Sequence, residues 1–505
     1  STQRDGIIVP DLPTIDTSTE QDVAGGGYNH WATAGFFGRL NYNYKEKYLL
    51  EVNGRYDGTS RFMKDQRWNF FPSFSLGWNV ARENFWKPLE SVVNQFKLRG
   101  SWGELGNQNT SNLYPFYEIL PVKSNSGNWL VNGGKTNTAD IPSLVSTLLT
   151  WERVRSFNVG FDFGAFSNRL TGSFDYFVRK TVDMVGPAPQ LPLVLGIAPA
   201  IVNNADMKSY GFEIELSWRD RIGEVDYGVK FNLADAQQKV VKYPNTTNAF
   251  SDWYAGKMSG EIWGYTSLGI AKTDEEMKEH LASLPNGGQN QLGNKWGAGD
   301  IMYADINGDG KIDGGKGTLA DPGDQRIIGN STPRYNFGLV LDASYKGFDV
   351  SIFFQGVGKR DYAPIVGTNG AVFWGAVNNI WQSMAMEEHF DYFRPEGHPM
   401  GANLNGYYPR PDFTSNKNHQ VQTRYLQDAS YIRLKNLQIG YTLPKQWINK
   451  LHINRCRVYV SGDNLWTGTS LASMFDPETL AAGDWGSGKT YPLSKVISFG
   501  LNVNF

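Results

Sequence analysis

The sequence predicts an all-β fold, and more specifically an antiparallel transmembrane β-barrel, from two features. The first is strict alternation: in the closing stretch Ile497, Phe499 and Leu501 fall on one face, and Ser498 and Gly500 on the other. A period of two is typical of a strand with one apolar and one polar face. The second feature is that the connections between such stretches alternate between short and long. A membrane barrel has this pattern, because its periplasmic turns are tight and its outer loops are long.

Strands with this alternation are expected along the whole chain, about thirteen in all. In a central example Phe212, Ile214 and Leu216 alternate with Glu213 and Glu215. The clearest strands lie near 35–44, 48–55, 74–80, 96–102, 157–163, 210–218, 227–233, 335–341, 348–354, 431–443 and 496–505. The long connections run over 58–70, 105–149, 182–206, 238–333, 359–427 and 466–492.

One strand departs from strict alternation. Within 431–443 the apolar phase slips between Leu434 and Leu437. An extra residue in one strand of a pair produces such a slip, so a β-bulge is predicted at Lys435 and Asn436.

Charge and hydropathy exclude several classes of protein. With a net charge of -2, the chain lacks the concentrated basic excess that phosphate binding requires, so nucleic acid is not an expected partner. No run of about 18 apolar residues occurs, so no membrane-spanning helix is expected. A string of soluble β-sandwiches is the alternative, but sandwich strands are short and their loops show no alternation of length.

The order of short and long connections also predicts how the chain contributes to a barrel. Residues 1–33 are expected to form an outer loop, and residues 34–505 the C-terminal part of the barrel, with its largest outer loops at 238–333 and 359–427. A complete bacterial barrel has an even number of strands and both ends on the periplasmic side. An odd count that starts in an outer loop predicts that the missing strands come from another chain or from an N-terminal part, since open edges in lipid are prohibitive.

Several stretches carry a family resemblance. They are, in order, 55–62 (RYDGTSRF), 101–107 (SWGELGN), 151–162 (WE to NVGFD), 305–310 (DINGDG) and 431–444 (YIRLKNLQIGYTLP). Together they resemble the SusC-like TonB-dependent outer-membrane transporters of Bacteroidetes over nearly the whole chain. The resemblance implies a barrel of about 22 strands, the size class with a plugged lumen. The plug domain and the first strands would lie upstream and are absent from this chain.

The same resemblance implies an activity, a location and partners. The activity is import of nutrient oligomers across the outer membrane, with energy from the inner-membrane TonB complex. A SusD-like surface lipoprotein would act as a lid, and two transporter–lid pairs would form a dimer. The N-terminal part of the same transporter and outer-membrane lipid are the other implied partners. Oligosaccharide is the expected substrate; the alternatives are an oligopeptide importer, a passive porin and a surface glycan-binding β-protein.

An acidic loop matches the start of a calcium-binding loop. Oxygen-bearing side chains stand at positions one, three, five and nine from Asp305, with Gly310 at position six for the turn. Position twelve should be acidic but is Lys316, and an insertion moves the candidates to Asp321 or Asp324, of which Asp324 is the better match from its sequence context. The predicted set for a structural Ca²⁺ is Asp305, Asn307, Asp309, Lys311, Asp313 and Asp324. The alternative is an acidic turn held by side-chain–backbone bonds without a metal.

Two further groups of side chains are candidates for contact with a ligand. Aromatic rings in the outer loops can stack on sugar rings, with loop packing or lid contacts as the alternative. These rings are Trp253, Trp263, Trp296, Trp374, Trp381 and Trp466. Charged side chains on the polar face of the strands are expected to line the lumen, against the plug or along the substrate path. They include Arg39, Arg55, Arg99, Glu213, Glu215 and Lys230.

The sequence carries no enzyme signature. It has no G-x-S-x-G nucleophile elbow, no H-E-x-x-H metal motif and no phosphate-binding Walker loop. Glu213 and Glu215 share a strand face and so resemble a catalytic carboxylate pair, but with Lys230 on the neighbouring strand they fit a lumen lining better. A transporter without a catalytic cofactor is therefore predicted.

Overall fold

The computed structural model describes residues 28–505 except 111, 124–125, 188–191, 193, 195, 198, 365–370, 376–384, 413–414, 450–451 and 481–489. Within these ranges no helix is long and apolar enough to cross a membrane. Most of the predicted outer loop 1–33 lies outside the described residues. Its described part is irregular from Tyr28 until the first strand begins at Thr33.

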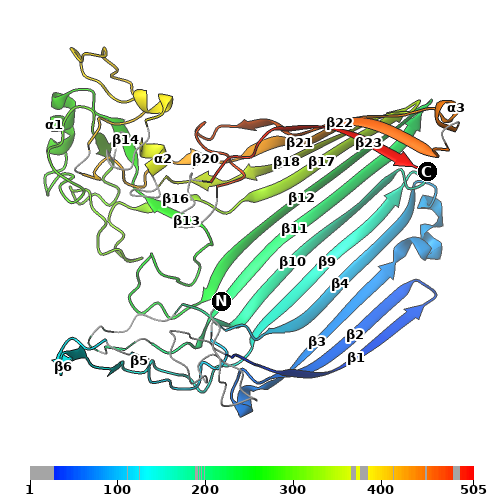
Figure 1. Ribbon diagram of the computed structural model, residues 1–505, viewed down its shortest axis with the longest axis horizontal. Helices are drawn as coiled ribbons and strands as arrows, with labels where there is room; N and C mark the ends of the chain where they lie inside the picture. Colours follow the sequence, from blue (N-terminus) through cyan, green and yellow to red (C-terminus); the bar gives the residue numbers. More distant parts are fainter. Residues whose placement is uncertain are drawn as a thin grey trace.

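A single antiparallel sheet of 13 strands organises the chain, which confirms the predicted fold class. Its strands lie side by side in the order of the sequence, from β1 at one edge to β23 at the other. Figure 1 shows them running obliquely across a long, curved sheet. The strands are β1 (Thr33–Tyr44), β2 (Tyr48–Thr59), β3 (Trp68–Asn79), β4 (Val93–Asn107), β9 (Glu152–Ala165), β10 (Leu170–Val185), β11 (Asn203–Ile222), β12 (Val225–Lys242), β17 (Arg334–Tyr345), β18 (Phe348–Lys359), β21 (Tyr431–Thr442), β22 (Arg455–Thr469) and β23 (Val496–Asn504).

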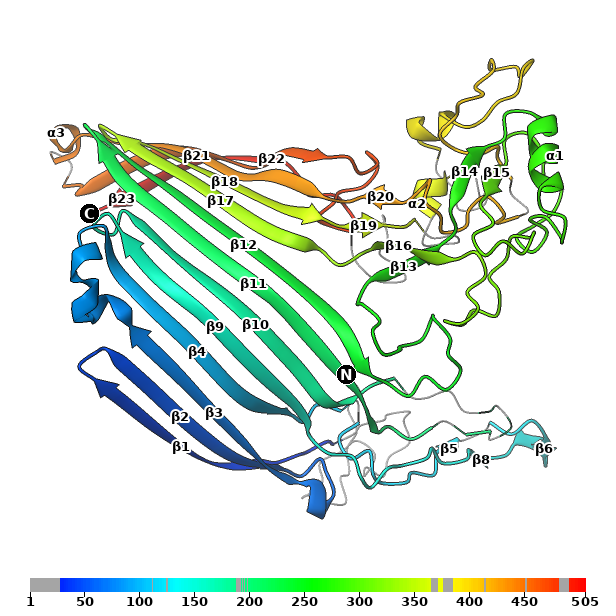
Figure 2. The ribbon, with the colours of Figure 1, turned by 180° about the vertical axis from the view of Figure 1, so that it is seen from behind.

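The long and short connections gather at opposite ends of the sheet, as Figures 1 and 2 both show. The short-turn end carries the helix α3 (Lys445–Ile448). The long-loop end carries the smaller elements, which are β5 (Val122–Lys123), β6 (Leu130–Val131), β7 (Gly134–Lys135), β8 (Thr138–Ala139), β13 (Glu261–Gly264), β14 (Ser267–Ile270), α1 (Asp274–Ala282), β15 (Ile301–Tyr303), β16 (Arg326–Asn330), β19 (Asp361–Tyr362), α2 (Ala371–Trp374) and β20 (Gln427–Asp428).

Tight turns join the strands at the short-turn end because their residues adopt left-handed backbone conformations. Between β1 and β2, Lys45 and Glu46 have φ of 53° and 52°. Between β9 and β10, Phe166, Ser167 and Asn168 have φ of 55°, 59° and 63°. Positive φ in the turn matches the right-handed twist of the flanking strands and closes the hairpin without splaying it.

The register divides the side chains between two faces, as the alternation predicts. Directly opposed residues share a face, and Leu216 lies opposite Gly172 on β10 and Phe231 on β12. The apolar face remains open: Leu40 is 63% exposed, Leu76 57% and Phe499 84%. A contiguous apolar surface of this kind marks contact with lipid or with another protein, and in an outer-membrane barrel it is the lipid-facing side.

The predicted β-bulge is confirmed. The pairing of β21 with β18 shifts register between Asn436 and Leu434, and its pairing with β22 shifts at the same residues. Lys435 is therefore the extra residue, and the two flanking positions return to opposite faces.

The largest hydrophobic core belongs to the long loops and not to the sheet. Buried residues of the long loops before β17, before β21 and after β22 form one cluster, here called the loop core. Its most buried members are Ile301, Tyr303, Ile312, Phe373, Trp374 and Ala429, all 0% exposed. A single-layer sheet with one lipid face and one wet face has no dry interior, so long loops that stay ordered need a core of their own.

Candidate functional site

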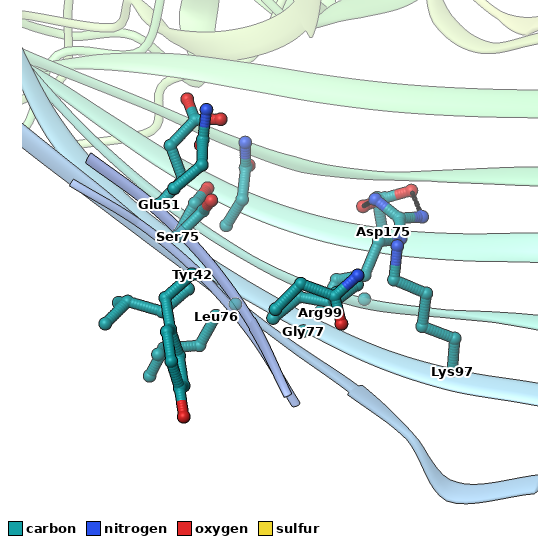
Figure 3. A pocket seen from close by; sticks show the side chains of 16 residues that line it. Tyr42, Glu51, Ser75, Leu76, Gly77, Lys97, Arg99 and Asp175 are labelled. Atoms are coloured by element: carbon teal, nitrogen blue, oxygen red, sulfur yellow. Dashed lines mark hydrogen bonds and ion pairs between the residues drawn. The ribbon is translucent and has the colours of Figure 1, made fainter. Parts of the chain in front are cut away.

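A hollow of about 450 Å³ lies on the polar face of the sheet between β1 and β10. In Figure 3, Glu51, Ser75 and Arg99 project from one side of the strands, whereas Tyr42 projects from the other. Neutral hydrogen-bonding side chains supply much of its wall, namely Asn41, Asn43, Ser75, Ser101 and Asn158. The hollow therefore offers hydrogen-bond donors and acceptors beside apolar contacts from Leu49, Leu50 and Leu76, which suits a ligand with both polar groups and apolar faces.

Arg99 ties three strands together at the edge of this hollow. Its guanidinium donates to the Asp162 carboxylate on β9 at 2.8 Å and to both carboxylate oxygens of Asp175 on β10 at 3.0 and 2.9 Å. A planar guanidinium bound by two carboxylates is held in one orientation. The remaining cation in the hollow, Lys97, forms no ion pair within the described residues.

The other predicted lumen-lining residues also lie on the polar face. Arg39 donates to the Asn53 side chain at 2.8 Å, and Arg55 pairs with Asp57 at 3.0 Å. Glu215 and Lys230 line a second hollow of about 580 Å³.

In the part of the chain that the structure describes, neither Glu213, Glu215 nor Lys230 takes part in an ion pair. Glu213 and Glu215 are exposed on β11, and Lys230 is exposed on β12. These three charges therefore remain available to a ligand or to a protein that fills the lumen.

The acidic loop uses its carboxylates on its own backbone. Asp305 accepts from the amides of Gly308 and Gly310 at 2.7 and 2.9 Å. The Asn307 side chain accepts from the Asp309 amide at 3.0 Å. Lys311 donates to the Asp313 carboxylate and holds the pKa of that carboxyl below its usual range.

Asp324 occupies the centre of this loop and is fully buried. Its carboxylate accepts from the Ile306 amide at 2.8 Å and from the Asp313 amide at 2.9 Å. Burial raises its pKa despite these bonds. The described residues contain no group of three or more His, Cys, Asp or Glu side chains placed to hold a metal ion. The present geometry is that of a self-supporting acidic turn, and the calcium site stays a prediction.

The predicted ligand-binding tryptophans lie in separate environments. Trp374 is fully buried in the loop core, and Trp296 packs against that core under the Lys417 ammonium, 5.0 Å from its ring. Trp263 stacks on Phe250 at 4.6 Å.

The other three differ again. Trp253 contacts the Tyr243 ring edge-on at 5.9 Å. Trp466 is 51% exposed on β22 opposite Leu434, on the apolar outer face of the sheet, where it suits the membrane interface better than a ligand inside. Trp381 lies outside the described residues.

A buried ionic cluster joins two long loops and was not predicted from the sequence. The Asp300 carboxylate, fully buried, accepts from the Arg410 guanidinium at 2.7 and 2.6 Å, from the Lys417 ammonium at 2.9 Å and from the Asn418 amide at 2.9 Å. Its partners come from more than a hundred residues further along the chain. No local sequence motif predicts such a contact, because it forms only when the two loops pack together.

His419 gives the loop core a dependence on pH. It is fully buried beside Trp374, with ring centroids 4.5 Å apart, and burial lowers its pKa to about 4 although the Asp412 carboxylate opposes this shift. Unfolded histidine takes up a proton below about pH 6.5, whereas folded His419 stays neutral down to about pH 4. The unfolded state therefore binds more protons between these values, and stability falls as the pH falls.

We expect the loop core to lose about 2 kcal/mol of local unfolding free energy between pH 7 and pH 5. Hydrogen exchange of the amides of β15, corrected for the intrinsic exchange rate, measures this loss in the full-length protein. The variant His419→Phe should remove most of this pH dependence. An unchanged slope in that variant would assign the effect to other groups.

Comparison with known proteins identifies the family. The family described as "TonB dependent receptor-like, beta-barrel" matches residues 3–465. TonB-dependent receptor P3 of Formosa agariphila is 30% identical over 499 residues, covering 93% of this chain and 45% of that protein. TonB-dependent receptor SusC of Bacteroides thetaiotaomicron is 24% identical, over 93% of this chain and 43% of its own length.

Solved structures show the same fold. The structure of the RagAB peptide transporter matches with a TM-score of 0.73 at 22% identity, covering 98% of this chain and 50% of that chain. The chain thus spans about half the length of the relatives it matches. Since the family match extends over most of its residues, the chain belongs to the TonB-dependent receptor β-barrel family and is a SusC-like protein of the bacterial outer membrane.

Proposed function

We propose that this chain forms the C-terminal part of the wall of a TonB-dependent importer that moves nutrient oligomers across the outer membrane. The observation that carries the proposal is the division of the sheet into an open apolar face and a polar face with hollows and unpaired charges. A passage for hydrated solutes through lipid requires this arrangement. Energy from the TonB complex and a SusD-like lid lipoprotein are parts of the proposal supported by family membership.

Oligosaccharide is the substrate class we propose. Amide and hydroxyl side chains form part of the wall of the first hollow and can exchange hydrogen bonds with sugar hydroxyls, and the apolar side chains beside them can pack against a sugar ring. Oligopeptide is the second candidate, because the unpaired Glu213, Glu215 and Lys230 offer partners for the charged groups of a peptide. The related fold of the RagAB peptide transporter is compatible with this second candidate.

Two measurements test the function. The full-length transporter, purified with its lipoprotein partner, should retain an oligosaccharide that mass spectrometry identifies; retained peptides would favour the second candidate. Uptake of the identified compound should stop in cells that lack the TonB complex. Uptake that continues at the same rate would show a passive porin instead.

A pair of neighbouring substitutions tests whether the first hollow lies on the substrate path. Asn158→Trp places a large ring in the hollow, and Val159→Trp places the same ring on the outer face, where Val159 is 45% exposed. We expect uptake to fall about tenfold or more in the first variant, since binding geometry and access are lost together. The second variant should transport as the wild type does. Equal uptake in both variants would remove the hollow from the path.

A further inference from the structure

Three lysines stand side by side on the outer face of the sheet at its long-loop end. Lys180 on β10 is directly opposite Lys208 on β11, and Lys208 is directly opposite Lys239 on β12. The register is continuous from this row to Leu216 and Trp218, so the lysines share the apolar face. Directly opposed side chains have Cβ atoms about 5 Å apart, and like charges in that position destabilise a sheet unless an anion lies between them.

The part of the chain that the structure describes places no such anion between these lysines. The neighbouring cation in the row, Arg155 on β9, is paired with Glu104 at 2.6 Å. The nearest carboxylate on the same face of β12, Asp235, is bound by Arg334. Among the described residues none of the three lysines forms an ion pair. Three positive charges in a row are left for a ligand from outside the chain.

The position of the row relative to the apolar surface indicates where that ligand comes from. Lys208 is two residues beyond Tyr210, over whose ring its ammonium lies at 5.2 Å. At a rise of about 3.4 Å per residue and a strand tilt of about 40°, the row begins about 5 Å above the last apolar side chains of β11. Tyrosine at the edge of an apolar belt marks the level of the lipid headgroups. The row therefore lies in the headgroup layer of the outer leaflet.

We propose that Lys180, Lys208 and Lys239 bind the phosphate groups of an outer-leaflet glycolipid. The outer leaflet of this membrane is built largely from phosphorylated glycolipids, and a phosphate has the charge to bridge adjacent ammonium groups. Because the strands are tilted, successive lysines differ by about 3 Å in their position along the membrane normal. The row can therefore contact a headgroup at several levels above the apolar layer. This site is separate from the substrate path, which lies on the opposite face.

Retention of lipid by the full-length transporter tests the proposal. The protein is placed in bilayer discs of uncharged lipid that contain a small fraction of lipid A, or of the same lipid after enzymatic removal of its phosphates. Native mass spectrometry then measures the bound glycolipid. We expect lipid A to be retained and the dephosphorylated form to be lost. Equal retention of both forms would overturn the proposal.

Variants distinguish this row from charge in general. Each basic side chain near a membrane surface strengthens binding of anionic lipid by about fivefold, so K180Q/K208Q/K239Q should weaken retention of lipid A by about a hundredfold. The matched control K45Q/K346Q/K445Q removes the same charge at the short-turn end and should retain lipid A as the wild type does. K180R/K208R/K239R keeps the charge and should also retain it, which guards against misfolding as the cause.

Inorganic phosphate separates the two sources of the anion. If millimolar phosphate displaces lipid A and binds equally well in discs without it, the site is one for free phosphate and the proposal fails. If retention in K180Q/K208Q/K239Q equals that of the wild type, the lysines have no part in lipid binding. Retention that falls in this variant alone, and resists free phosphate, supports the glycolipid site.

Discussion

Asp300→Ala should unfold the loop core while the sheet remains intact. The substitution removes the nearer carboxylate from the Lys417 ammonium, which is 1% exposed, and leaves it with Asp412 at 3.7 Å. It also removes the ion-pair partner of the Arg410 guanidinium. Removal of one partner from a buried ion pair costs about 3–5 kcal/mol, because the other charge stays in a medium of low polarity. A loss of this magnitude is a large part of the total unfolding free energy of a typical domain.

Hydrogen exchange in the full-length transporter measures this effect. Amides of β15, next to Asp300, should exchange at least about a hundredfold faster, which is the increase in rate that a loss of about 3 kcal/mol produces. The exchange rates of the β11 amides should not change. Glu279→Ala is the control, since Glu279 is an exposed acid of α1 in the same loop and its removal should change stability by less than about 0.5 kcal/mol. Equal protection in the two variants would mean that the cluster contributes nothing to the fold.

A double variant separates the net contribution of the ion pair to stability from the cost of leaving one buried charge without its partner. Asp300→Asn/Lys417→Met removes both charges and keeps an amide to accept hydrogen bonds from Arg410 and Asn418. Apolar or neutral replacement of a complete buried pair is often tolerated, so the double variant should recover part of the loss seen in Asp300→Ala. If the double variant is as unstable as the single one, the loop core depends on the hydrogen bonds of the cluster and not on the balance of its charges.

The sheet could be predicted from the sequence because the alternation within each strand shows which residues share a face. Phe212, Ile214 and Leu216 alternate with Glu213 and Glu215, and the register places them on opposite faces as the pattern requires. The bulge at Lys435 was also visible, since a phase slip is a local property. Lipid outside and water inside impose the same rule on every strand, so no knowledge of distant residues is needed.

The long loops could not be predicted in this way. Trp374 has the same chemistry as an exposed ring that stacks on a sugar, yet it is fully buried. Its burial depends on Tyr408 and Tyr425, which follow it by more than thirty residues, and on no periodic pattern. The same holds for Asp300 and Lys417. Charged residues are usually exposed, so neither residue type by itself indicates a buried position.

Ile214→Arg should destabilise the barrel, and Glu215→Arg should not. Ile214 lies midway between Tyr210 and Trp218 on the apolar face, between Phe174 and Leu233. An arginine at the middle of the lipid face of a membrane barrel costs about 2–4 kcal/mol, and the cost falls towards the interfaces. Glu215 is the next residue along β11, but its side chain enters the wet interior, where an arginine remains hydrated.

The comparison is sharp because the two substitutions introduce the same side chain on adjacent residues of one strand. The measurement is a guanidinium titration of the full-length transporter refolded into lipid bilayers, with tryptophan fluorescence as the signal. A fold with the opposite orientation, in which Ile214 faces inward, requires the reverse order of stability. If the two variants unfold at the same denaturant concentration, then neither face contacts lipid, and the assignment of the sheet to a membrane wall is wrong.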